Sequence, residues 1–160
     1  MIIRAERPAD YAAIRKMLAS AFGGGQEASL VETLRAEGAI NVALVAELDG
    51  RVGGHVVVSR LRSPVGGMAL APVAVEPTRQ NQGVGSALVR EAIDRAKGAG
   101  GQIMFVLGDP AYYRRFGFST EASAAFQSPY AGPHFMALPL TDAPVVGGAV
   151  SYPAAFDKLS

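Results

Sequence analysis

Hydrophobic residues in the N-terminal part of the chain change from a helical to an extended spacing. Apolar residues recur every three or four positions from Ile14 to Phe22, which is typical of a helix with one buried side. Further along, short apolar runs are separated by turn residues, which favours strands. The pattern predicts a strand at Ile2–Ala5, helices at Pro8–Phe22 and Glu27–Glu37, and strands at Val42–Leu48 and Arg51–Leu61 joined by an Asp49-Gly50 hairpin turn.

The same alternation continues through the rest of the chain. It predicts strands at Met68–Val75 and Gln102–Leu107, an amphipathic helix at Val84–Lys97, a short helix opened by Asp109-Pro110, and strands around His134–Leu140 and Ala149–Tyr152. In the long helix the expected buried stripe is Leu88, Val89, Ala92, Ile93 and Ala96. The order of elements predicts one α+β domain over residues 1–160. Its mostly antiparallel mixed sheet should have about seven strands and be flanked by about four helices.

Pro72 interrupts the strand predicted at Met68–Val75. Proline has no N–H to donate to a neighbouring strand, so pairing should fail there and the strand should bulge or splay. A second interpretation, that Pro72 marks a strand at the edge of the sheet, fits the sequence equally well.

Composition and charge exclude several classes of function. The chain has 160 residues and a formal net charge of +1, and its basic residues are scattered rather than gathered into a nucleic-acid-binding stripe. No apolar run approaches the ~18 residues of a membrane span. The N-terminal sequence MIIRAERPAD lacks the apolar core of a signal peptide, so a cytoplasmic location is expected. The absence of cysteine excludes disulfides and a cysteine nucleophile, and His55 and His134 lack ligand spacing, so no metal is expected.

A polar, glycine-containing loop precedes the long helix. The start of a helix has unpaired N–H groups and about half a positive charge, so glycines there allow an anion to approach the backbone. The dinucleotide fingerprint is excluded because Leu88 stands where its third glycine belongs. The Walker loop is excluded because this loop has no lysine after its glycines. The remaining pattern is Gln80-x-x-Gly83-x-Gly85. The alternative is a plain flexible connection.

This pattern resembles the pyrophosphate loop of the Gcn5-related N-acetyltransferases (GNAT), Arg/Gln-x-x-Gly-x-Gly/Ala. Downstream, Tyr113-Arg-Arg-Phe-Gly-Phe118 matches the family's Tyr-x-x-x-Gly-Phe element, and the order of elements matches over nearly the whole chain. Gly108-Asp-Pro-x-Tyr-Tyr113 is similar to the motif of a little-characterised bacterial branch. The resemblance implies a GNAT-like sheet splayed in its middle and acetyl-CoA as co-substrate.

The resemblance also implies where the cofactor lies. Its pantetheine arm should run between the strands ending at Val75 and Leu107 and pair with backbone groups that the break at Pro72 leaves free. The cofactor-binding residues expected on this basis are Val73, Val75, Gln80, Asn81, Gln82, Gly83, Val84, Gly85, Ser86, Asp109 and Tyr113. Asp109 is explained better as a helix N-cap than as a catalytic base.

Tyr113 occupies the family's general-acid position and is expected to donate a proton or a hydrogen bond to the departing thiolate. Its neighbour Tyr112 lies about 100° around the helix, so we expect it to point elsewhere and to pack in the core with Phe116. The candidates for the base are Glu76 and Glu27. His55 is also considered, because histidine is a common general base, but a histidine hydrogen-bonded within the sheet is the more frequent arrangement.

The predicted activity is acyl-CoA-dependent N-acyltransfer to an amino group of a small molecule or peptide, with acetyl-CoA as the expected donor. Because no cysteine can carry the acyl group, direct attack in a ternary complex is favoured. Two alternatives stay open: transfer of a longer acyl chain or to a hydroxyl group, and a non-catalytic acyl-CoA-binding regulatory domain. The acceptor pocket is expected at residues 22–34 and 119–134, and the protein is expected to be a monomer or homodimer.

Overall fold

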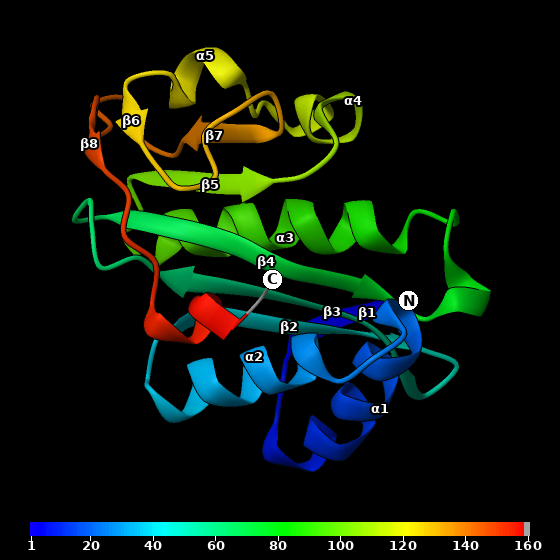
Figure 1. The fold of residues 1–160 in the computed structure, drawn as a ribbon. Helices are drawn as coiled ribbons and strands as arrows, with labels where there is room; N and C mark the ends of the chain where they lie inside the picture. Colours follow the sequence, from blue (N-terminus) through cyan, green and yellow to red (C-terminus); the bar gives the residue numbers. More distant parts are fainter. Residues whose placement is uncertain (159–160) are drawn as a thin grey trace.

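Six strands form one mixed sheet in the computed structural model, which describes residues 1–158 (Figure 1). Strands β4 and β5 are parallel, and the other neighbours in this sheet are antiparallel. Across the sheet the order is β1 (Ile2–Ala5), β2 (Ile40–Leu48), β3 (Arg51–Arg60), β4 (Gly67–Val75), β5 (Ile103–Leu107) and β7 (Phe135–Pro139). The α+β class and the mostly antiparallel mixed sheet are confirmed.

Helices cover both faces of the sheet (Figure 1). Helices α1 (Tyr11–Phe22) and α2 (Gln26–Ala36) pack on one face, and α3 (Val84–Gly98) packs on the other. The shorter elements are α4 (Pro110–Tyr113), α5 (Thr120–Ser123) and the 3-10 turns η1 (Pro8–Asp10), η2 (Pro77–Arg79), η3 (Arg114–Phe116) and η4 (Ala154–Lys158). Among residues 1–158, no helix combines the length and the apolar character needed to cross a membrane.

The core has two parts, one on each face of the sheet. Because side chains alternate along a strand, Val57 of β3 packs under α1 and α2 while its neighbours Val56 and Val58 pack under α3. Helix α3 buries the predicted stripe: Leu88, Val89, Ala92, Ile93 and Ala96 are all at most 7% exposed. The periodicity of this helix was therefore a sufficient guide to its buried side.

The C-terminal part of the chain differs from the expectation of one sheet of about seven strands. The two-residue strands β6 (Phe126–Gln127) and β8 (Gly148–Ala149) pair with each other in a separate small sheet. Beyond β8, Ser151 forms only an isolated bridge with Ser63. The strand predicted at Ala149–Tyr152 is therefore much shorter than expected, because this segment crosses the end of the sheet and does not extend it.

Pro72 produces a bulge in an interior strand. Val56 and Val58 of β3 lie opposite Val73 and Leu70 of β4, so two residues of β4 face one residue of β3 between these pairs. On its other side β4 pairs with β5 only from Gly67 to Ala69. Beyond that point the two strands diverge, as Figure 1 shows. The predicted bulge and splay are confirmed, and the interpretation of Pro72 as an edge marker is wrong.

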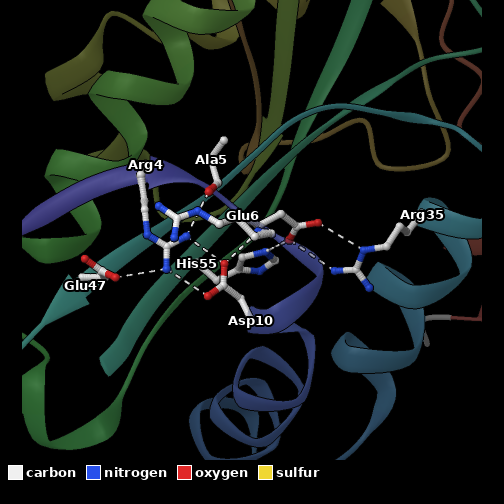
Figure 2. Close-up of polar contacts among 8 residues, drawn as sticks. Arg4, Ala5, Glu6, Asp10, Arg35, Glu47 and His55 are labelled. Carbon is white, nitrogen blue, oxygen red and sulfur yellow. Dashed lines mark hydrogen bonds and ion pairs between the residues drawn. The ribbon is translucent and has the colours of Figure 1, made fainter. Parts of the chain in front are cut away.

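A cluster of ion pairs joins β1 to the segment before α1 (Figure 2). Arg4 donates to both carboxylate oxygens of Asp10, at 2.8 and 2.9 Å, and to Glu47 at 3.1 Å. Asp10 also accepts a hydrogen bond from the backbone N–H of Arg7 at 2.7 Å. The hydrogen bond from Arg4, helped by that from Arg7 and opposed by burial, lowers the pKa of Asp10 to about 2.

Replacing Asp10 should therefore destabilise the protein in a pH-dependent way. The pKa of Asp10 is lower in the folded state than its ordinary ~3.9, so its stabilisation is complete above about pH 4 and is lost as the pH falls towards 2. Asp10→Asn should lower Tm at pH 7 by a few degrees, because about 1 kcal/mol corresponds to about 2–4 °C in a domain of this length. Thermal unfolding at pH 7, 5 and 3 checks this.

The control for this prediction is Asp94→Asn, which makes the same change of charge at an exposed position of α3. We expect it to leave Tm nearly unchanged at all three pH values. A deficit for Asp10→Asn that stays constant from pH 7 to pH 3 would show that the charge of Asp10 does not stabilise the fold.

Candidate functional site

The predicted anion-binding loop forms the start of α3. Gly83 is the N-cap residue, with φ of +85°, and Asn81 also has a positive φ of +63°. Residues with a side chain seldom adopt this left-handed conformation, which explains the glycine at position 83. No side chain accepts a hydrogen bond from the first turn of α3 within the described residues. These N–H groups are therefore available to an anion.

This helix start opens onto a cavity of about 550 Å³, which we call the α3 cleft. Its walls come from the end of β4, the loop, the first turn of α3, and the segment around α4 and η3. The lining residues are Val73, Val75, Gln80, Asn81, Gly83, Gly85, Ser86, Tyr112, Tyr113 and Arg115. The fold thus brings together β4, the loop and the tyrosine segment, which lie far apart in the sequence.

Eight of the eleven residues expected to bind the cofactor line the cleft, and three do not. The exceptions have other partners. The side-chain amide of Gln82 donates a long hydrogen bond, 3.5 Å, to the carbonyl oxygen of Thr78. Val84 is buried in the core. Asp109 accepts a hydrogen bond from the N–H of Ala111 at 3.0 Å, which is the N-cap role that its sequence position favours.

The backbone of Val75 is less free than expected. Its carbonyl oxygen accepts a hydrogen bond from the side-chain amide of Gln80, at 3.1 Å. The first polar residue of the loop thus ties the loop to the end of β4. Val73, two residues earlier, lies beyond the last β4–β5 pair at Ala69, on the stretch of β4 that borders the cleft.

Tyr112 and Tyr113 both line the cleft, so the expectation that they point into different spaces is wrong. Their rings meet edge to face with centroids 5.0 Å apart. Tyr112 does contact Phe116, at 5.3 Å between centroids, but it is only half-buried. Its hydroxyl group lies 3.0 Å from the hydroxyl of Ser86, on the first turn of α3. The Tyr112 ring therefore joins the tyrosine segment to the loop.

Tyr113 packs more deeply than Tyr112. Its ring contacts Phe118 edge to face, with centroids 5.8 Å apart, and it covers Gly108, where a Cβ would lie 2.5 Å from the ring. Burial, and secondarily the neighbouring Tyr112, raise the pKa of Tyr113 to about 12. The phenol is therefore protonated at neutral pH, and Tyr113 can donate a proton or a hydrogen bond but cannot act as a base.

A second cavity, of about 290 Å³, lies where β4 and β5 separate. We call it the splay pocket. The strands contribute Ala69, Leu70, Ala71, Phe105, Val106 and Leu107, and the C-terminal part of the chain contributes Tyr130, Tyr152 and Phe156. Tyr130 belongs to the segment 119–134 in which the acceptor pocket was expected, whereas the segment 22–34 contributes no residue to it.

Comparison with known proteins identifies the family of this chain. Residues 11–118, more than half of the chain, match the model of the acetyltransferase (GNAT) family. The chain belongs to the GNAT family of acetyltransferases. It is 37% identical, over 76% of its length and 75% of the relative, to a protein named uncharacterized N-acetyltransferase YhbS of Escherichia coli K12.

Solved GNAT structures share the whole fold of this chain. The structure of Escherichia coli YhbS in complex with CoA has a TM-score of 0.91 at 33% identity, covering 99% of this chain and 93% of that one. A GNAT family acetyltransferase of Brucella melitensis in complex with acetyl-CoA has a TM-score of 0.84 at 38% identity, covering 98% and 97%. The GNAT-like fold expected from the sequence is thereby confirmed.

The three residues considered as bases in this GNAT chain lie outside both cavities. Glu76 follows β4 and lines a separate groove under α1, together with Arg4 and Glu47. Glu27, in the first turn of α2, is half-buried. As bases, Glu76 and Glu27 stay predictions, and neither is among the residues that line the α3 cleft or the splay pocket.

His55 is fully buried and has a structural partner. Its Nε2 lies 2.8 Å from Oε1 of Glu6, and the Glu6 carboxylate also accepts hydrogen bonds from Arg35, at 3.1 Å to Oε2 and 3.2 Å to Oε1 (Figure 2). Burial alone would raise the pKa of Glu6, but the hydrogen bonds from His55 and Arg35 outweigh it and hold the pKa below its ordinary value. His55 is thus a hydrogen-bonded core histidine, as the more frequent arrangement predicted.

Sequence reasoning missed Tyr112 and Arg115 as residues of the cleft. The guanidinium of Arg115 lies over the Tyr112 ring, 4.6 Å from its centroid. Arg115 is the charged residue among those that line the cleft in the described part of the chain. A signal was available: Tyr113 is followed by two arginines, in a protein whose glycine loop carries no lysine.

Proposed function

We propose that this GNAT chain transfers an acyl group from an acyl-CoA, acetyl-CoA first, to an amino group of a small molecule or peptide. Residues 1–160 would form one N-acetyltransferase domain, in the branch that carries Gly108-Asp-Pro-x-Tyr-Tyr113. The observation that carries the proposal is the start of α3, whose glycines and uncapped N–H groups open onto a cleft that also contains Tyr113. The CoA and acetyl-CoA bound by its relatives support it.

In this proposal the start of α3 and Arg115 hold the pyrophosphate. The N–H groups of the first turn are oriented towards the anion before it binds, and the helix dipole adds a partial positive charge. The guanidinium of Arg115 would supply a full charge at the other wall of the cleft. The backbone N–H and C=O groups of β4 near Val73, which have no partner on β5, would pair with the amide groups of the pantetheine arm.

The transfer itself moves one acyl group and one proton. The lone pair of a neutral amine attacks the thioester carbon, a C–N bond forms, and the C–S bond breaks with its electron pair on sulfur. The nitrogen gives up one proton and the sulfur gains one, so the products are an amide and the free CoA thiol. Tyr113 is placed to donate to the sulfur, since its pKa of about 12 keeps it protonated at neutral pH. Glu76 or Glu27 would receive the amine proton, through water.

Activity can be measured without protein background, because the chain has no cysteine. A screen of amines, peptides and aminoglycosides, read with a thiol reagent, should reveal at least one acceptor that releases CoA from acetyl-CoA. Tight acetyl-CoA binding without CoA release from any acceptor class would instead support a non-catalytic, acyl-CoA-binding regulatory domain.

With such an acceptor, initial rates should follow a ternary-complex mechanism. Without a cysteine to hold the acyl group, both substrates must be bound before transfer, so double-reciprocal plots at varied acetyl-CoA and acceptor should intersect. Parallel lines, together with an acetylated protein found by mass spectrometry in the absence of acceptor, would contradict direct attack.

A further inference from the structure

The splay pocket and the α3 cleft share strand β4 but lie on opposite faces of the sheet: Val73 and Val75 pack with the core under α3, whereas Ala69 and Ala71 pack with the core under α1 and α2. On β4, Val73 and Val75 line the cleft, and Ala69 and Ala71 line the pocket. Pairing between β4 and β5 stops at Ala69, so beyond this point no backbone ladder closes the sheet between the two cavities. A molecule with its phosphates at the start of α3 would therefore reach the splay pocket by passing its far end through the gap between β4 and β5.

The wall of this pocket is apolar. None of the described residues that line it is charged, and β4 contributes only alanine and leucine to it. Its outer wall is aromatic: Tyr130 meets Tyr152 edge to face at 5.0 Å between centroids, and Tyr152 meets Phe156 at 5.2 Å. Burial, and secondarily Tyr130, raise the pKa of Tyr152 above its ordinary value, so this phenol also stays neutral.

The pocket is larger than an acetyl group needs. A methyl group occupies about the volume of a water molecule, ~30 Å³, whereas the pocket holds about 290 Å³. The small side chains of Ala69 and Ala71 leave this space open on the β4 side. On the other side the pocket is closed by residues from the C-terminal part of the chain, Tyr130, Tyr152 and Phe156.

We propose that the splay pocket binds the acyl chain of an acyl-CoA several carbons longer than acetyl. The inference rests on the proposed function and specifies the donor. The transfer keeps the balance given above: the amine nitrogen takes the acyl carbon, and the CoA sulfur leaves with the electron pair and a proton. The apolar wall would select the donor by its chain, while the α3 cleft binds the part common to all acyl-CoA molecules.

The acceptor fits this pocket less well than an acyl chain does. Most aliphatic amines are ammonium ions at neutral pH, and burying an unpaired charge is strongly unfavourable. The polar side chains among the lining residues are the tyrosines Tyr130 and Tyr152, which offer hydroxyl groups but no carboxylate to pair with an ammonium. An alkyl chain has no such requirement and gains from each carbon that it buries.

Calorimetry with CoA, acetyl-CoA, butanoyl-CoA and hexanoyl-CoA tests the inference on the whole chain without an acceptor. We expect affinity to rise about fourfold for each added methylene, the gain expected when a CH₂ group is buried. Equal affinities for acetyl-CoA and hexanoyl-CoA would overturn this inference but not the proposed function. The pocket would then be assigned to the acceptor. Failure to bind CoA and all three thioesters would overturn the proposed function as well.

Two variants show whether the gain arises in the pocket. Ala71→Leu fills it from β4, and Leu107→Trp fills it from the end of β5, where Leu107 is 52% exposed, so we expect the fold to accept the larger side chain. Either variant should abolish the dependence of affinity on chain length. Ala36→Leu, the same change at an exposed site in α2, is the control and should keep it. A chain-length dependence that survives in a folded pocket variant would overturn the inference.

Discussion

Tyr113→Phe is expected to lower the turnover rate at least tenfold, with little change in acetyl-CoA affinity or Tm. The substitution removes only the hydroxyl group, and the ring keeps its contacts with Phe118 and Gly108. General acid catalysis contributes about 10²–10⁴-fold, but a thiol of pKa ~8.5 is already a fair leaving group, so only part of this range is expected. Steady-state rates of CoA release, with the best amine of the acceptor screen, provide the measurement.

Tyr112→Phe is the matched control, because it removes the neighbouring hydroxyl from the same cleft. That hydroxyl lies 3.0 Å from Ser86 on the phosphate-binding turn. Its loss should therefore raise KM for acetyl-CoA and affect turnover much less than Tyr113→Phe does. Wild-type turnover in Tyr113→Phe would mean that Tyr113 is not the acid and that solvent protonates the thiolate.

Gly85→Val should weaken acetyl-CoA binding by at least tenfold, or about 1.4 kcal/mol. A Cβ at position 85 would lie 3.5 Å from the Tyr112 hydroxyl and from Val75, which is an ordinary contact distance. The fold can therefore accept the side chain, but the two further methyl groups of valine would extend into the cleft where the backbone should meet the pyrophosphate. Calorimetry with acetyl-CoA measures the change, and thermal unfolding verifies the fold.

Two other glycines, one at each end of α3, distinguish effects on binding from effects on stability. Gly98→Val, at the opposite end of the helix, has no atom within 4 Å of the new Cβ and should leave the affinity unchanged. Gly83→Val should weaken binding as well, but a side chain at φ of +85° is strained, so this variant should also lower Tm. Unchanged acetyl-CoA affinity in folded Gly85→Val and Gly83→Val would exclude the loop as the binding site.

The features that the sequence determined are those governed by short-range physics. The buried stripe of α3 follows from its own periodicity. The glycine loop could be recognised because glycine permits a positive φ and lets an anion approach the N–H groups at a helix start. At Pro72 the sequence predicted a missing backbone donor, but only the order of the strands showed that the break lies in the interior of the sheet. The α+β class follows from the order of such elements. Each element, taken singly, depends on residues within a few positions of one another.

Tertiary packing decided the rest. Tyr112 belongs to the cleft because α4 lies against the start of α3, through a contact with Ser86 across 26 positions of sequence. The splay pocket exists because Tyr130, Tyr152 and Phe156 return over the gap between β4 and β5. Glu76 lines the groove under α1 and neither of the two cavities, although it directly follows β4. Such placements depend on where distant segments pack against one another, and the spacing of side chains along the sequence does not specify these contacts.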